Sequence, residues 1–195
     1  MLRTAKYLLL LTIIYNIGEG IIAIWSGTAA GSIALVAFGA DSFIEVVAAA
    51  LVLWRLGIMD TALAEVVEQR VVRFIGWTFL LLSAVIVFEC ASALMNQDGA
   101  EESLVGIAVA LASVTLQPLI ALWKLRIARR ANLRSLAIEA KETFACSFLS
   151  LALLIGLVSN ALLGWWWLDS VTAMVLVPWL LREGLAGIRT SPSLA

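Results

Sequence analysis

Six stretches of the chain are each long and apolar enough to cross a lipid bilayer as one helix, which takes about 20 residues. Their apolar residues are continuous and do not alternate with polar ones, which favours helices over the strands of a membrane barrel. Of the 195 residues, 63% are hydrophobic and only 14% are charged, and a soluble domain of this size cannot hide so much apolar surface. The sequence therefore predicts an all-α polytopic membrane protein, a six-transmembrane-helix bundle, with spans at residues 5–26, 32–56, 71–96, 103–125, 133–163 and 165–187.

The connections between the spans are short, which predicts one membrane domain over residues 1–189 and a short C-terminal tail at 190–195. Residues 59–70 are expected to form a polar, amphipathic linker between the second and third spans. Gly164 is expected to form a tight turn before the last span.

The basic residues outside the fifth span all fall on one side of the predicted membrane. Because Lys and Arg are retained on the cytoplasmic side of membrane proteins, this side should be cytoplasmic, and both termini should lie there. A multi-pass protein of the cell membrane is expected, in the inner membrane if the source is Gram-negative. The basic residues concerned are Arg3, Lys6, Arg55, Arg70, Arg73, Lys124, Arg126, Arg129, Arg130, Arg134, Arg182 and Arg189.

Two pairs of polar side chains stand inside the second and fifth spans. An ionised group at mid-bilayer costs about 2.5–3.5 kcal/mol, so it needs compensation or a function. Asp41 and Glu45 are four residues apart, as are Glu142 and Cys146, so each pair shares one helix face. At about 1.5 Å per residue, both pairs fall near the middle of the bilayer.

If the second and fifth spans touch, these four ligand-type side chains converge. Three are carboxylates that repel one another, and a divalent cation would remove that repulsion. Three oxygens and one thiolate make a plausible tetrahedral metal site of Asp41, Glu45, Glu142 and Cys146. Two simpler interpretations stay open: Cys146 as a small apolar side chain, and the carboxylates as hydrogen-bond partners of neighbouring helices.

Other charged residues within the spans have less definite roles. Glu19 and Glu89 lie in the outer halves of their spans, where they either line an exit pathway or sit at the membrane interface. Lys141 is expected either to extend its ammonium group toward the interface or to neutralise Glu139.

The two pairs give the chain a resemblance to the cation diffusion facilitator family. The second span, with Asp41 and Glu45, resembles the family's second helix, which typically carries Asp or His and then Asp four residues apart. The fifth span, with Glu142 and Cys146, resembles the fifth helix, where the usual pair is His and Asp. The chain looks like a compact, transmembrane-only branch, because the cytoplasmic domain that many members carry after helix six is absent.

The resemblance implies secondary transport of a divalent cation through this site, as proton-coupled efflux by a homodimer. The thiol favours Zn²⁺, with Cd²⁺, Co²⁺ and Fe²⁺ as further candidates. A metal-binding protein or sensor that does not transport, and a structural membrane protein without a ligand, remain as alternatives. An enzyme is not expected, since the chain has no histidine and no nucleophile with a base beside it. The expected partners are the cation, protons and membrane lipid, with no other cofactor and no nucleic acid.

Overall fold

A computed structural model describes residues 2–30, 33–96, 104–165 and 167–189, and almost all of them are helical. Six segments are long and apolar enough to cross a membrane, so the predicted all-α fold with six spans of membrane length is confirmed for the described residues. The acidic third connection and the C-terminal tail lie outside the described residues. The helices are α1 (Leu2–Ala30), α2 (Ile33–Arg55), α3 (Thr61–Asn96), α4 (Leu104–Ala131), α5 (Arg134–Leu163), α6 (Leu168–Met174) and α7 (Val177–Ile188).

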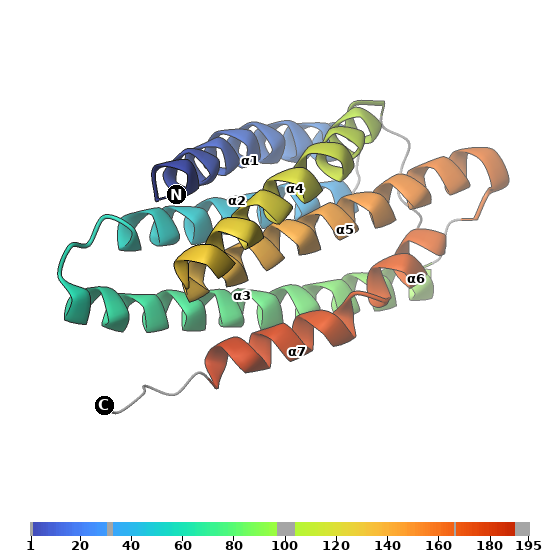
Figure 1. Ribbon diagram of the computed structural model, residues 1–195. Helices are drawn as coiled ribbons and strands as arrows, with labels where there is room; N and C mark the ends of the chain where they lie inside the picture. Colours follow the sequence, from blue (N-terminus) through green and yellow to red (C-terminus); the bar gives the residue numbers. More distant parts are fainter. Residues whose placement is uncertain (1, 31–32, 97–103, 166, 190–195) are drawn as a thin grey trace.

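Four of the helices form a closed group, and the others lie along one side of it (Figure 1). α1 packs against α2 and α4, and α5 completes the group by packing against both α2 and α4. α3 lies against α2 and α5 and packs against α7, while α6 contacts both α3 and α5. Side chains that point between α1, α2, α4 and α5 are therefore shielded from lipid, which is where polar groups in a membrane protein are tolerated.

The third helix begins earlier than the sequence predicted. Residues 61–70, expected to be linker, form the first turns of α3, which is 36 residues long. Asp60 caps this helix, because its carboxylate accepts a hydrogen bond from the backbone N–H of Leu63 at 3.0 Å. The connection from α2 is consequently reduced to a few residues.

The sixth spanning segment is broken into α6 and α7 by a turn at Val175 and Leu176. Pro178, in the first turn of α7, explains the break, because proline lacks the N–H that would continue the helix from the preceding turn. Gly164 has a φ of +67°, so the predicted tight turn before this segment is present.

The helices α3 and α7 approach each other through glycine. A Cβ atom added to Gly76 would lie 2.9 Å from the backbone oxygen of Gly184, and one added to Gly187 would lie 3.0 Å from the Cα of Gly76. Small residues at such crossings let two membrane helices meet backbone to backbone. Phe79 and Trp179 extend the same contact, with their rings edge to face and 6.0 Å apart.

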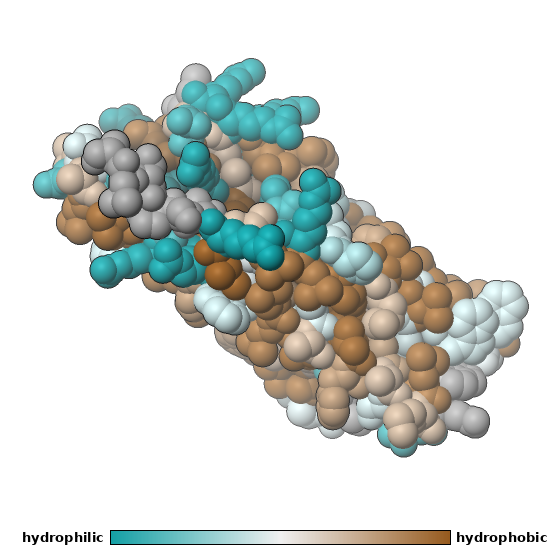
Figure 2. Space-filling model, turned by 90° about the horizontal axis from the view of Figure 1, so that it is seen from below, coloured by the Kyte–Doolittle hydropathy of each residue, from teal (hydrophilic) through white to brown (hydrophobic). Residues whose placement is uncertain are grey.

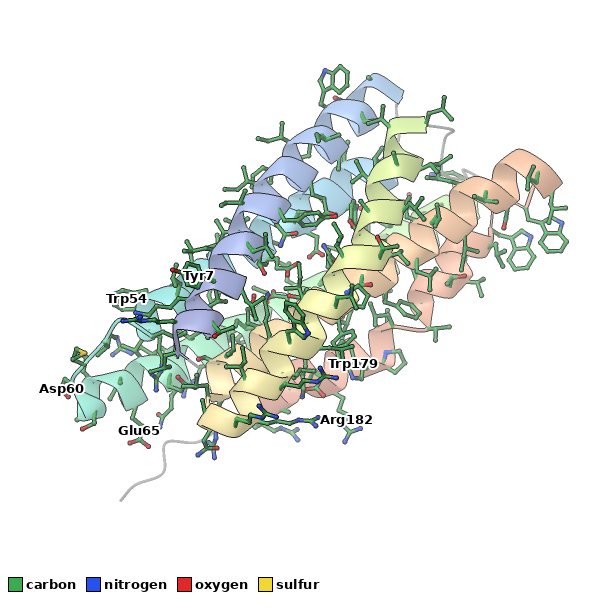
Figure 3. All side chains as sticks on the ribbon, turned by 45° about the horizontal axis from the view of Figure 1, so that its top comes forward. Tyr7, Trp54, Asp60, Glu65, Trp179 and Arg182 are labelled. Atoms are coloured by element: carbon green, nitrogen blue, oxygen red, sulfur yellow. The ribbon has the colours of Figure 1, made fainter. Side chains whose placement is uncertain are left out.

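The outer surface is apolar along most of its length, and hydrophilic side chains gather at one end of the molecule (Figure 2). That end, where α3 begins and α7 ends, also carries the start of α1 and is here called the basic end (Figure 1). Asp60, Glu65 and Arg182 lie there (Figure 3). Tyr7 and Trp54 are well exposed, at 72% and 59%, as aromatic residues near a membrane interface often are.

Candidate functional site

The two predicted pairs lie at the same level of α2 and α5, which pack against each other. Thr143 on α5 donates a hydrogen bond of 2.5 Å from its hydroxyl to Oε1 of Glu45 on α2. The thiol of Cys146 lies close enough to the Asp41 carboxylate to interact with it electrostatically. The contact between the second and fifth spans that the predicted site requires is therefore present, with the two pairs at matching depths.

The four predicted side chains are all buried. Their exposed fractions are 8% for Asp41, 1% for Glu45, 4% for Glu142 and 1% for Cys146. Charged groups with so little solvent access are stabilised only by other charges or hydrogen bonds. All four side chains are therefore shielded from solvent by the packing of the helices.

Glu142 is held by a third helix. Its Oε1 accepts a hydrogen bond of 2.8 Å from Thr78 of α3, while its Oε2 has no partner among the described residues. The Oε2 atom of Glu45 is likewise buried and without a described partner. Buried carboxylate oxygens in this state require a cation or a proton, because an unpaired buried charge is strongly unfavourable.

In this conformation the four side chains do not form a complete metal-coordination site. Within the described part of the chain, no three Cys, Asp or Glu side chains stand close enough together to hold a metal ion. Asp41 and Cys146 are in contact, and Glu45 and Glu142 lie within electrostatic range of each other. A shared cation would need Glu142 to leave Thr78 and turn toward α2.

A buried lysine joins this region to the basic end of the bundle. Lys124 of α4 and Glu139 of α5 form an ion pair of 2.5 Å, and both side chains are fully buried. The same ammonium group donates a hydrogen bond of 3.0 Å to Thr143, which in turn bonds to Glu45. One continuous hydrogen-bonded chain therefore leads from Glu139 to the candidate site.

This ion pair corrects two sequence-based expectations. Glu139 is neutralised by Lys124 and not by Lys141, which instead pairs with Glu183 of α7. Lys124 was counted among the basic residues that flank the membrane, but it lies inside the bundle. Its position near the end of a span hid this role, because basic residues there commonly extend into the headgroup region.

The two candidate pathway residues have different surroundings. Glu19 is 4% exposed and accepts hydrogen bonds from side chains of α2 and α4, so it lies inside the four-helix group and not at an interface. Glu89 is half-buried on α3, which lies outside that group. The structure therefore places Glu19, but not Glu89, beside the candidate site.

A second polar contact ties α2, α3 and α5 together at the basic end. Glu68 of α3 forms an ion pair with Arg55 of α2, and its two oxygens accept hydrogen bonds from the backbone N–H and the hydroxyl of Ser135, at 2.7 and 3.0 Å. The N–H is one that the first turn of α5 leaves unsatisfied. No local sequence signal predicts this contact, because its members are far apart in the chain.

The chain was compared with models of known protein families and with functionally characterised proteins, and neither comparison gave a significant match.

Proposed function

We propose that the protein is a secondary transporter of divalent metal cations, with Zn²⁺ as the preferred substrate, and that the cation binds between α2 and α5. The observation that carries this proposal is the presence of two buried carboxylate oxygens, Oε2 of Glu45 on α2 and Oε2 of Glu142 on α5, that have no partner among the described residues. Asp41 and Cys146 lie together next to them and supply the remaining oxygen and sulfur. A cation bound here would remove the repulsion among three carboxylates.

The ligand chemistry favours zinc over harder ions. A thiolate is a soft ligand, and mixed oxygen and sulfur sites select Zn²⁺ or Cd²⁺ over Mg²⁺ or Mn²⁺. Metal binding requires the deprotonated thiol and carboxylates, so protons compete with the metal for the same atoms. That competition supplies the coupling for efflux in exchange for protons.

A transporter that works by alternating access must close its binding site at one end of the bundle while the other end is open. The contact of Glu68 with Arg55 and Ser135 joins α2 to α5 at the basic end, which the distribution of Lys and Arg assigns to the cytoplasm. In this proposal the contact closes the cytoplasmic entrance, and the opening motion separates the helices that bear the metal ligands. Two copies of the chain are expected to work as a homodimer in the cell membrane.

Zinc uptake into proteoliposomes that hold an entrapped zinc-sensitive dye tests the proposal. With an outward-directed proton gradient, the wild-type protein should drive dye fluorescence above that of empty vesicles. Glu142→Gln should lower the initial rate at least tenfold, since it removes a charged ligand. Glu89→Gln, the same substitution on a half-buried residue of α3, should leave the rate unchanged.

The same vesicles separate the other functions. Zinc binding to the purified protein without flux would identify a sensor or a metal-binding protein. Neither binding nor flux, or flux that Glu142→Gln leaves intact, would contradict the proposed transport site.

A further inference from the structure

A second buried polar cluster surrounds Glu19, next to the candidate metal site but built of different chemistry. The Glu19 carboxylate accepts hydrogen bonds from Ser42 of α2 at 3.0 Å and from Gln117 of α4 at 3.0 Å. It also accepts hydrogen bonds from Tyr15, at 3.2 Å, and from Ser113 of α4. Three helices of the four-helix group therefore converge on one carboxylate.

Two amide groups at this cluster are incompletely bonded. Gln117 and Asn16 are each 1% exposed, and Oε1 of Gln117 and Nδ2 of Asn16 have no partner within the described part of the chain. The two amides meet through Nε2 of Gln117 and Oδ1 of Asn16, which are 3.4 Å apart. A buried amide oxygen without a partner costs free energy, which a bound ligand of positive charge would offset.

The side chains of the cluster all carry hard oxygen atoms, although the Gln117 amide presents its nitrogen to Glu19. There is one carboxylate, there are the hydroxyls of Tyr15, Ser42 and Ser113, and there are the amide oxygens of Asn16 and Gln117. Oxygen-only sites suit hard cations. The cluster itself holds a single carboxylate, which balances one positive charge. The nearby carboxylates of Asp41 and Glu45, within electrostatic range of Glu19, are ligands of the proposed divalent site.

We propose that the Glu19 cluster is a sodium-binding site. The hydroxyl groups that now donate to Glu19 can rotate to present their lone pairs, and a half-turn of the Gln117 amide presents Oε1. Sodium binding itself does not depend on the proposed metal transport. Any coupling between sodium binding and metal transport does depend on the proposed transport. Gln117 gives such coupling a direct route, because its Nε2 also lies 3.5 Å from the sulfur of Cys146.

Thermal unfolding of the purified full-length protein in detergent tests this site, with NaCl, KCl and choline chloride compared at equal ionic strength. The wild-type Tm should rise by several degrees with NaCl in a saturable way, and not with the other two salts. Glu19→Gln should abolish the rise. Ser113→Ala, which keeps the charge, should shift the response to higher sodium concentrations. Glu89→Gln serves as the matched control and should respond as the wild type does.

Two results would overturn the sodium site. One is a wild-type Tm that is the same in NaCl and choline chloride, or that rises equally in KCl. The other is a sodium-dependent rise that survives unchanged in Glu19→Gln and Ser113→Ala. Should Glu19→Gln fail to fold, Ser113→Ala and direct binding of radioactive sodium to the wild type decide the question. Glu142→Gln should keep the sodium response while losing zinc transport, so the two proposals fail separately.

Discussion

Replacing Lys124 by Met should lower the free energy of unfolding by about 3–5 kcal/mol, the usual effect of breaking a buried ion pair from one side. The substitution leaves the fully buried Glu139 carboxylate without its cation and Thr143 without one hydrogen-bond donor. The measurement is unfolding by a denaturing detergent in mixed micelles, followed by tryptophan fluorescence.

A double variant separates charge imbalance from loss of packing. Lys124→Met with Glu139→Leu removes both charges and should recover most of the lost stability, because apolar pairs often replace buried ion pairs at little cost. Lys141→Met is the matched control: Lys141 is 37% exposed in its pair with Glu183, so its loss should cost about 1 kcal/mol or less. A Lys124→Met protein as stable as the Lys141→Met protein would show that Lys124 and Glu139 are not an ion pair in the membrane.

Replacing Cys146 by Ser should weaken Zn²⁺ and Cd²⁺ binding more than the 10- to 100-fold that loss of an outer-shell partner costs. Serine keeps the size of the side chain, but its hydroxyl is a poor substitute for a thiolate toward soft ions. Mn²⁺ binding, which depends on the carboxylates, should change far less. Isothermal titration of the purified protein with each ion measures the three affinities.

The matched control for this prediction is Cys90→Ser. Cys90 is also buried, but it lies on α3 and donates to the backbone oxygen of Ser170, away from the α2–α5 contact. Zinc affinity should be unchanged in this variant. Equal losses in both serine variants would indicate a general effect of replacing a buried thiol, and Cys146 would then be a small apolar side chain and not a ligand.

The six spans were predictable, because long apolar runs are local features of a sequence, whereas the contact between the second and fifth spans is tertiary and had to be assumed. The beginning of α3 was not predictable, since residues 61–70 mix apolar with charged residues and form no continuous apolar run. The break in the last span had a signal in Pro178 that a hydropathy count overlooks.

The surroundings of the candidate site were harder to predict than its residues. Lys124 lies about two turns from the end of its helix, where a basic residue ordinarily reaches water, so only the packing of α4 on α5 reveals its burial. Ser113 and Gln117 are four residues apart, as are Tyr15 and Glu19, and this repeated spacing was an available signal of a polar face. Neutral polar residues are common in spans, however, and their convergence depends on tertiary contacts.

X-ray absorption at the zinc edge, on purified protein loaded with one equivalent of Zn²⁺, tests most directly whether α2 and α5 close around a divalent cation. We expect one sulfur ligand at about 2.3 Å and oxygen ligands at about 2.0–2.2 Å, with the sulfur lost in Cys146→Ser and kept in Cys90→Ser. A first shell without sulfur in the wild type, or a sulfur signal that persists in Cys146→Ser, would contradict this expectation.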